Sequence, residues 1–451
     1  MSAPTDYASS LAHLRALGRA GIDLRLDRVR RVAEGLGNPQ LKYATILVAG
    51  TNGKGSTCAM LDSMLNAAGY RCGLYTSPHL VRETERVRVC GSEITPQMFA
   101  ESARAVYEAA EKAAAARPPG ASLLTAFEFL TLLAFDALAR AKVEIAVIEV
   151  GLGGRLDATN IVDPLVTVIA PISMDHEQYL GDTLEAISHE KAGILRPGVP
   201  FIHGSRHHEV KRVIAEICQQ NNVPLKQAGA DFDFLPLRDQ HMHYAGFAGA
   251  WRDLKVGLSG MHQLDNAAMA CAVAEVLGET KFPVSTEAVR EGLQSVRWRG
   301  RMETLSTQPL VLCDGAHNRD AARSLRRYLE QYVPFRKIHL IVGHTRDRDV
   351  EAFLSILAPV AARVTLTQTS DGALADPESL LPLALRVHKN VVVESDLSKI
   401  LRQIYWRKPE DELIVVSGSL YLVGETIGLL ESGEIAGFES ARGVIMSPLD
   451  A

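Results

Sequence analysis

The residues best suited to chemistry follow an apolar run at Ile46–Ala49, which breaks into the loop Gly50–Ser56, read GTNGKGS. The apolar run predicts a buried strand, and the apolar residues after the loop recur at helical spacing. The glycines permit a tight turn whose N–H groups face inward, and the helix that follows adds the positive end of its dipole. Lys54 supplies a point charge, and the Ser56 hydroxyl is a ligand type that magnesium accepts. These features predict a binding loop for a chain of phosphates.

The loop departs from the strict phosphate-loop pattern G-x-x-x-x-G-K-[ST]. Val48 stands at the position of its first glycine and Gly55 at the position of its Ser or Thr. On the string alone, the alternative is a glycine-rich turn between a strand and a helix, in which Lys54 is simply solvated.

A second candidate follows the apolar stretch at residues 143–150. There Glu149 ends the predicted strand and leads into the glycines of EVGLGGRLDATN at 149–160. An acid at the end of a strand beside a phosphate loop is a typical magnesium ligand. Ser77 also lies at the carboxyl end of a predicted strand, where open α/β sheets bind their ligands.

Six segments, in this order and spacing, resemble motifs of the dihydrofolate and folylpolyglutamate synthases, a branch of the Mur-ligase superfamily. They are GTNGKGS at 50–56, EVGLGGRLDATN at 149–160, the loop Asp175-His176, EKAGI at 190–194, the hinge at Arg301, and DGAHN at 314–318. The resemblance runs from Ile22 to Tyr421 and so covers most of the chain. Its implications for function can be assigned to individual residues.

The resemblance implies a ligase that adds L-glutamate to dihydropteroate, to folylpolyglutamate or to both. A carboxylate is a poor electrophile, so ATP first converts it to an acyl phosphate, and the amine of L-glutamate then attacks to give an amide, ADP and phosphate. ATP is the co-substrate and Mg²⁺ the metal. The predicted catalytic residues are Lys54, His176 and Lys191. The predicted metal ligands are Ser56, Ser77, Glu149, His176 and, if it is carbamylated, Lys191.

The predicted ATP-binding residues come from both halves of the chain. They are Gly50, Thr51, Asn52, Gly53, Lys54, Gly55, Ser56, Asn266, Arg301, Asp314 and His317. Arg301 carries a planar guanidinium suited to bidentate contact with phosphate oxygens. Asn266 is also an ordinary cap or first-turn residue of a helix, which is its alternative interpretation.

Three short segments are predicted by resemblance to bind the folate or pteroate. They are Asp23, Leu24 and Arg25; Thr125, Ala126, Phe127 and Glu128; and Leu156, Asp157 and Ala158. The second segment also has the form of a helix capping box, T-x-x-E. The form RLDAT at 155–159 is the one associated with bifunctional members, and it favours a pteroate acceptor.

The sequence departs from the family pattern at several places. Arg25 replaces a usual Gly, Arg299 and Arg319 replace usual Pro residues, and no basic segment is recognisable near residue 370. The last departure leaves any contact between that loop and a glutamate tail without support.

Predicted strands and helices alternate along most of the chain, which is the pattern of α/β sheets that bring strand ends to one edge. The expected fold class is α/β, with an N-terminal P-loop ATPase-like parallel-sheet domain and a smaller C-terminal Rossmann-like α/β domain. The expected limits are 1–296 for the ATP- and folate-binding domain, 297–302 for a hinge, and 303–451 for the glutamate-ligase domain. Residues 231–258 alternate weakly between apolar and polar, which is consistent with a small antiparallel addition.

Composition narrows the class of protein. The chain has 451 residues, of which 47% are hydrophobic, and a net charge of −5, so it is expected to be globular with two or three domains. The sequence has no basic tract, which argues against nucleic acid as a partner. The N-terminus has no targeting pattern and no apolar run approaches the length of a membrane span, which predicts a cytoplasmic protein with no membrane partner. Six scattered cysteines predict reduced thiols, and a monomer is expected.

Other functions remain open on the sequence. Within the same class they are a monofunctional folylpolyglutamate synthase and, behind it, a Mur peptidoglycan ligase. A P-loop NTPase would hydrolyse nucleotide without a carboxylate acceptor, and a double α/β scaffold would bind no nucleotide at all.

Overall fold

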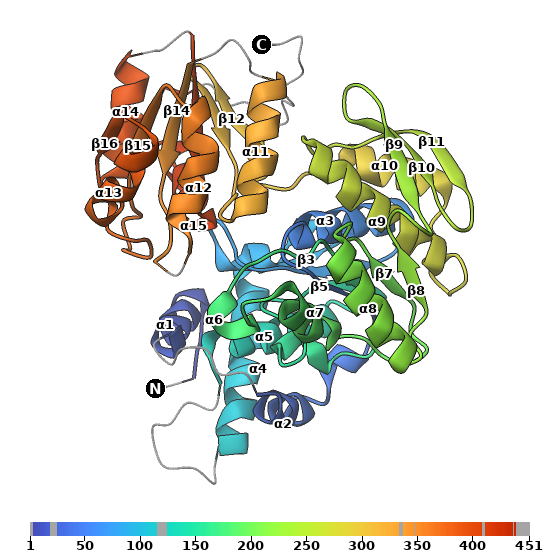
Figure 1. Ribbon diagram of the computed structural model, residues 1–451. Helices are drawn as coiled ribbons and strands as arrows, with labels where there is room; N and C mark the ends of the chain where they lie inside the picture. The colour runs from blue at the N-terminus through green and yellow to red at the C-terminus, as the bar shows by residue number, and fades with distance from the viewer. Residues whose placement is uncertain are drawn as a thin grey trace.

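The computed structural model describes residues 3–18, 25–114, 124–332, 337–346, 348–407, 411–435 and 437–438. The ribbon separates into two α/β parts, each built on one large sheet, with the second part at the upper left of Figure 1 in orange to red. A small third sheet stands beside the first part at the upper right. The predicted α/β fold with a larger N-terminal and a smaller C-terminal sheet is confirmed.

The first sheet has eight strands in the order β4-β3-β2-β5-β1-β6-β7-β8. Six neighbouring strands from β2 to β8 run parallel, while β3 and β4 form an antiparallel hairpin at one edge. The bounds are β1 (Ala44–Ala49), β2 (Cys72–Tyr75), β3 (Val87–Val89), β4 (Ser92–Glu93), β5 (Ile145–Glu149), β6 (Pro164–Ile169), β7 (Phe201–His203) and β8 (Leu225–Gln227). The sequence does not predict the hairpin, because its two strands are too short to display alternation.

The side chains of β1 alternate between the two faces of this sheet, as a strand requires. Ile46 and Val48 pack against one set of helices, and Leu47 and Ala49 pack against the other. The first set is α3 (Lys54–Ala67), α9 (Met261–Leu277) and α10 (Thr286–Ser295). The second is α1 (Tyr7–Leu17), α2 (Asp27–Gly35), α4 (Pro96–Ala114), α5 (Ala126–Arg140), α7 (Leu184–Ala192) and α8 (His208–Gln220). Both faces are therefore buried, which explains why β1 reads as a continuous apolar run.

The small sheet has the order β11-β10-β9 and is antiparallel. Its strands are β9 (Asp233–Pro236), β10 (His241–Ala245) and β11 (Ala250–Lys255). Met242, Tyr244 and Leu254 are buried and belong to the same core as α9. The predicted antiparallel addition at 231–258 is confirmed.

The second large sheet has the order β12-β13-β17-β14-β15-β16. Its strands are β12 (Glu303–Thr307), β13 (Leu310–Cys313), β14 (Lys337–Val342), β15 (Arg363–Leu366), β16 (Val391–Val393) and β17 (Glu412–Ser417). Helices α11 (Arg319–Tyr332), α12 (Val350–Leu357) and α13 (Pro377–Val387) pack on one face, and α14 (Leu397–Arg407) and α15 (Leu420–Glu431) on the other. The edge strand β12 pairs antiparallel with β13 through a tight connection, while the other neighbours run parallel.

The segment between the two parts lies between the end of α10 at Ser295 and the start of β12 at Glu303. Arg299, which departs from the family pattern, forms ion pairs with Glu303 at 3.1 Å and with Glu431 at 3.0 Å. These pairs join the segment to the first strand and the last helix of the second part. The two ion pairs of Arg299 thus hold the backbone of the connecting segment in one course. A proline would restrict that backbone through its fixed φ angle instead.

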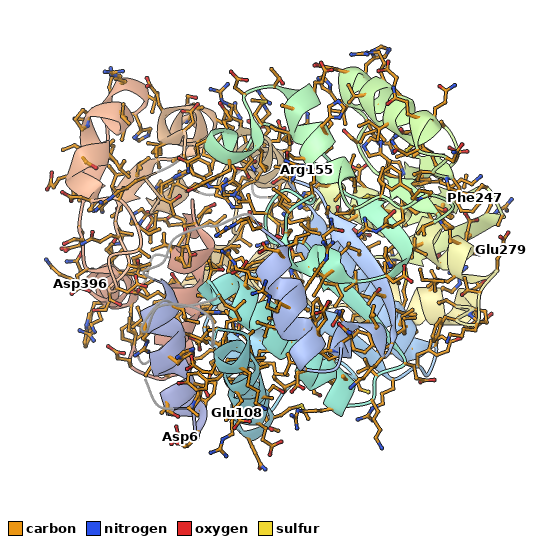
Figure 2. All side chains as sticks on the ribbon, turned by 90° about the horizontal axis from the view of Figure 1, so that it is seen from below. Asp6, Glu108, Arg155, Phe247, Glu279 and Asp396 are labelled. Carbon is orange, nitrogen blue, oxygen red and sulfur yellow. The ribbon has the colours of Figure 1, made fainter. Side chains whose placement is uncertain are left out.

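The surface carries ionised side chains around its rim, including Asp6, Glu108 and Asp396 in Figure 2. Across the described part of the chain, no helix combines the length and the apolar content that crossing a bilayer requires. All six cysteines are free, as predicted.

Candidate active site

Four neighbouring strands of the first sheet end at the same edge, and each is followed by predicted site residues. The order β2-β5-β1-β6 is parallel throughout, so the carboxyl ends of these strands lie side by side. Ser77 follows β2, Glu149 ends β5, Gly50–Ser56 follow β1, and Asp175 and His176 follow β6. The topology thus gathers residues that are widely separated in the sequence.

The loop Gly50–Ser56 is attached to the segment after β6. The N–H groups of Thr51 and Asn52 donate to the carbonyl of Pro171 at 3.0 and 3.3 Å. The hydroxyl of Thr51 donates to the Ser173 carbonyl and accepts its N–H, both at 3.1 Å. Four hydrogen bonds to one short segment hold the loop in a fixed shape.

Two glycines of the loop allow other segments to approach its backbone. Gly53 has a φ of 89°, and a Cβ built on it would lie 2.3 Å from Oδ1 of Asn266. A Cβ on Gly55 would lie 3.0 Å from Nε1 of Trp298. Helix α3 begins at Lys54, so the N–H groups of its first turn have no intrahelical carbonyl to bind and point toward the loop. The geometry is that of an anion-binding helix N-terminus.

Glu149 is 5% exposed and accepts the backbone N–H of Ser77 at 3.0 Å. Burial raises the pKa of the Glu149 carboxyl, and the positive charge of Lys54 opposes that rise. The ammonium of Lys54 donates to the Thr51 carbonyl at 3.2 Å. A buried carboxylate that contacts Ser77 and lies near the charge of Lys54 is suited to a hard cation that bridges protein and phosphate.

Lys191 lies on α7 beneath the phosphate loop. It is 3% exposed, and its Nζ donates to the carbonyl of Gly50 at 2.8 Å. Burial, together with the charge of Lys54, lowers the pKa of Lys191 to about 7. An amine in this state is far more often neutral at physiological pH than a surface lysine is.

The second part contributes Arg301, Asp314 and His317. Asp314 is 5% exposed and accepts the N–H groups of Met302 at 3.0 Å and Ala316 at 2.9 Å. Burial raises the pKa of Asp314, and Arg301 opposes the rise. Burial and the charge of Arg348 lower the pKa of His317 to about 3, so its ring is neutral. Asp314 therefore orders the loop that carries His317.

Polar side chains from both parts meet over the phosphate loop. The amides of Asn52 and Asn318 exchange two hydrogen bonds, at 3.2 and 3.0 Å. Arg348 forms an ion pair with Asp175 and donates to Nε2 of His176 at 2.9 Å. Burial alone would raise the pKa of Asp175, but the surrounding positive charges, of which Arg348 is the largest, together lower the pKa below its usual value. The second part thus contacts both the phosphate loop and the loop after β6.

The residues predicted to bind the folate are packed together where the structure describes them. Helices α2 and α5 both contact the 3₁₀ helix η4 (Ala158–Ile161). Glu128 accepts the N–H of Thr125 at 2.7 Å, and Arg28 of α2 donates to Glu128 at 2.8 Å. A Cβ on Gly151 would lie 2.3 Å from the ring of Phe127, so this glycine lets the ring rest on the backbone.

The capping interpretation of the T-x-x-E segment is confirmed, because Thr125 and Glu128 form a reciprocal capping box on α5. Asp157 is buried and caps η4 through the N–H of Thr159 at 2.9 Å. Leu156 and Ala126 are half-buried beside these caps. Arg25 is exposed, whereas Asp23 and Leu24 lie outside the described residues. The contacts found for Glu128 and Asp157 are with the protein itself.

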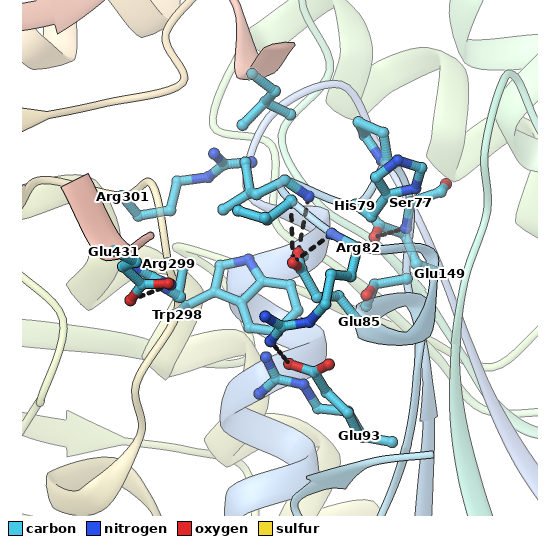
Figure 3. A pocket seen from close by; sticks show the side chains of 17 residues that line it. Ser77, His79, Arg82, Glu85, Glu93, Glu149, Trp298, Arg299, Arg301 and Glu431 are labelled. Carbon is cyan, nitrogen blue, oxygen red and sulfur yellow. Dashed lines mark hydrogen bonds and ion pairs between the residues drawn. The ribbon is translucent and has the colours of Figure 1, made fainter. Parts of the chain in front are cut away.

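A cavity of about 60 Å³ opens at the junction of the two parts. Figure 3 shows Ser77, His79 and Glu149 on one side and Trp298 and Arg301 on the other. Gly55 of the phosphate loop also lines it. The cavity therefore connects the candidate metal ligands with the segment that joins the parts.

The described residues contain no group of three or more His, Cys, Asp or Glu side chains placed to hold a metal. The predicted ligands do not form such a group, because only Glu149 and His176 among them are of these residue types. The others are the hydroxyls of Ser56 and Ser77 and the side chain of Lys191. Ser56 is buried, and Glu149 has one oxygen on the Ser77 N–H, which leaves further lone pairs for a cation. The donor set fits a hard divalent ion whose remaining ligands are phosphate and water.

Sequence reasoning assigned no site role to Arg348 or Asn318. Both belong to segments whose resemblance to the family is visible, GHTRDRD and DGAHN, but neither string shows what its side chain contacts. Each partner lies more than a hundred residues earlier in the chain. Their position after strands of the second sheet is the one sequence signal that pointed to them.

Comparison with known proteins places the chain among ligases of one superfamily. The family described as Mur ligase middle domain matches residues 48–274, and the Mur ligase glutamate ligase domain matches residues 300–420. The dihydrofolate synthase/folylpolyglutamate synthase of Escherichia coli is 38% identical over 358 residues, which cover 79% of this chain and 81% of that protein.

Two solved structures are similar over almost the whole chain. Escherichia coli FolC in complex with DHPP and ADP has a TM-score of 0.86 and 33% identity, covering 96% of this chain and 100% of that one. A bifunctional folylpolyglutamate synthase/dihydrofolate synthase with Mn, AMPPNP and L-glutamate bound has a TM-score of 0.83 and 33% identity, covering 96% and 99%.

Proposed function

The chain belongs to the dihydrofolate synthase/folylpolyglutamate synthase family of Mur ligases, and on that premise we propose how its own residues carry out ATP-dependent joining of L-glutamate to a folate-type carboxylate. The observation that carries the proposal is the meeting of a phosphate loop, the buried Glu149 and charged residues of the second part around one cleft. This arrangement can hold a nucleotide between two domains.

The reaction proceeds in two balanced steps. An oxygen of the acceptor carboxylate bonds to the terminal phosphorus of ATP, the bond from that phosphorus to the bridging oxygen breaks, and ADP leaves. The amine of L-glutamate then attacks the acyl carbon, phosphate leaves with the former carboxylate oxygen, and the nitrogen loses a proton to form the amide. Lys54 and the N–H groups at the start of α3 stabilise the negative charge that moves during the first step.

Divalent cations would be held by Ser56, Ser77 and Glu149 on one side and by His176 and carbamylated Lys191 on the other. When bound, such a cation neutralises phosphate charge and aligns the terminal phosphate. Arg301, whose guanidinium lies at the cavity, binds phosphate oxygens from the second part. Asn266, pressed against Gly53 of the first part, and His317 of the second part contact the nucleoside portion. Asp314 orders the loop that carries His317.

The lowered pKa of Lys191 supports its carbamylation. Only a neutral amine attacks CO₂, and a pKa of about 7 makes that form abundant near neutral pH. The nitrogen bonds to the carbon of CO₂ and releases a proton, so the neutral amine becomes an anionic carbamate. The product would relieve the unfavourable burial of positive charge next to Lys54 and could bind a metal.

The acceptor includes dihydropteroate, so the protein is bifunctional. The RLDAT string supports this proposal. So does the packing of α2, which carries Arg28, against both the Thr125–Glu128 segment and η4. The protein acts in the cytoplasm as a monomer, with domains at 1–296 and 303–451 joined by a hinge at 297–302. Light scattering at the protein concentration of the assay measures the molar mass, and the 49.0 kDa of a single chain is expected.

A panel of acceptors tests the function. Dihydropteroate and a tetrahydrofolate are each incubated with ATP and L-glutamate, and products are weighed by mass spectrometry. A glutamyl increment on both acceptors is expected. An increment on the tetrahydrofolate alone would show that the enzyme is monofunctional. Phosphate release without any acceptor would show that it is an NTPase.

Lys54→Ala removes the charge at the outer phosphates, and with it the hydrogen bond to the Thr51 carbonyl. We expect a loss of at least roughly a hundredfold in kcat, the size seen when one charge-stabilising donor is removed, with an unchanged unfolding midpoint. Lys255→Met, a change at an exposed lysine of β11, is the matched control. A fully active Lys54→Ala enzyme would remove this lysine from the mechanism.

A further inference from the structure

One contact between the two parts lies directly on the predicted metal loop. Arg348 follows β14 in the second part, and its side chain is 14% exposed. Nη1 pairs with Oδ1 of Asp175, and Nη2 donates to Nε2 of His176 at 2.9 Å. One planar guanidinium therefore spans two consecutive side chains of the first part.

The chemistry of these groups restricts what His176 can do at the same time. A guanidinium carries donors only, so Nε2 of His176 accepts through its ring lone pair. The same lone pair is the one that a histidine nitrogen offers to a metal ion. It cannot serve both partners, and the arginine charge also repels a divalent cation at that position.

We propose that Arg348 is a positioning residue that couples closure of the second part to the Asp175–His176 loop and that keeps a divalent cation from Nε2 of His176 until the Nη2 bond is released. The inference rests on the proposed function, because it takes His176 as a metal ligand. The two prongs act independently. Nη1 anchors Asp175, so the loop stays attached to the second part when Nη2 gives up the imidazole.

Neighbouring contacts support the anchoring role. Asn318 also donates to Asp175, at 3.4 Å, while its amide is paired with Asn52 of the phosphate loop. His317 Nε2 lies 3.9 Å from the second oxygen of Asp175. Asp175 is thus the point at which the second part holds the first, and the bond to His176 is an additional contact that can be exchanged for a cation.

The test measures Mn²⁺ binding to the full-length, nucleotide-free protein, by the loss of the free-ion signal in electron paramagnetic resonance. Arg348→Ala removes the competitor for His176, and the dissociation constant for Mn²⁺ is expected to fall roughly tenfold, the scale of a hydrogen bond to a charged group. Arg319→Ala is the matched control, because it deletes an arginine–aspartate pair with Asp349 at 2.5 Å that does not touch the loop. The control is expected to leave the constant unchanged.

A double-variant cycle isolates the histidine. In the His176→Ala background, adding Arg348→Ala is expected to give no further gain in Mn²⁺ affinity. An equal gain in both backgrounds would overturn the inference, because the arginine would then act by charge alone. An unchanged constant in Arg348→Ala, beside weaker binding in His176→Ala, would also overturn it while leaving the proposed metal site intact. If His176→Ala binds Mn²⁺ as the wild type does, with ATP present as well, the proposed metal site itself fails.

Discussion

Replacing Lys191 by Met removes a buried amine whose protonation links folding to pH. Burial lowers the pKa of Lys191 to about 7 in the folded protein, against an ordinary value of 10.5 that returns on unfolding. Between these two values the unfolded chain binds more protons, so the unfolding free energy rises with pH across this window. The gap corresponds to about 5 kcal/mol in total, or about 1.4 kcal/mol per pH unit.

Urea unfolding of the wild type and of Lys191→Met, between about pH 7 and pH 10 in buffer freed of CO₂, measures this term. The wild type is expected to gain stability relative to the variant as the pH rises from about 7 to about 10, so the difference between the two proteins is largest at the lower end of this range. Lys255→Met, at an exposed site, should follow the wild type. Parallel curves for the wild type and Lys191→Met would refute the reasoning, because they would mean that folding does not alter the protonation of this amine.

Bicarbonate converts the same experiment into a test of carbamylation. A carbamate forms only on the folded protein, so added bicarbonate should raise the unfolding free energy of the wild type and leave that of Lys191→Met unchanged. Isotopically labelled bicarbonate should give a carbamate carbon resonance in the wild type that Lys191→Met lacks. An unfolding free energy of the wild type that bicarbonate leaves unchanged would show that the amine stays unmodified.

The remaining predictions concern the phosphate loop and the ion pair between α2 and α5. Gly53→Ala places a Cβ 2.3 Å from Asn266 Oδ1 at a φ of 89°, and is expected to weaken binding of a fluorescent ATP analogue at least roughly tenfold while the left-handed backbone costs about 1–2 kcal/mol. Gly18→Ala, with open space around its Cβ, is its control. Glu128→Ala leaves Arg28 buried without this carboxylate and should lower the unfolding free energy by about 3–5 kcal/mol. The double variant with Met at positions 28 and 128 should recover most of that lost free energy, because it leaves no unpaired buried charge. A raised KM for dihydropteroate at unchanged stability would instead make Glu128 a substrate ligand.

The sequence predicts those parts of the fold whose cause is local. The strand β1 and helix α3 are predictable because an apolar run, a glycine turn and a helical pattern follow one another within about twenty residues, and each has its own physical signal. Glu149 is predictable for the same reason, since a strand that ends in a charged residue is unusual. The hairpin β3–β4 and the edge strand β12 are short and partly polar, so pairing with a neighbour, and not their own pattern, creates them.

Long-range polar contacts are the part of the site that no local pattern reveals. Arg28 reads as one more charge on an amphipathic helix. Its side chain is nevertheless only 6% exposed, and it pairs with the carboxylate of Glu128, a hundred positions later in the chain. Arg348 reads as a loop residue, yet it spans Asp175 and His176. In both cases the identity of the side chain permits a surface role or a buried pair, and only the packing of distant elements decides between them.

The contacts that join the two parts over the phosphate loop also suit a cleft that must open and close. They are amide–amide and charge-assisted hydrogen bonds, such as those of Asn52 with Asn318 and of Asp175 with Arg348. A polar ligand can replace each of them at a small net free energy, because one hydrogen bond is exchanged for another. An apolar seam at this place would favour one closed state irrespective of the ligand. The exchangeable contacts therefore allow substrate and cation binding to drive closure, which excludes the water that would hydrolyse an acyl phosphate.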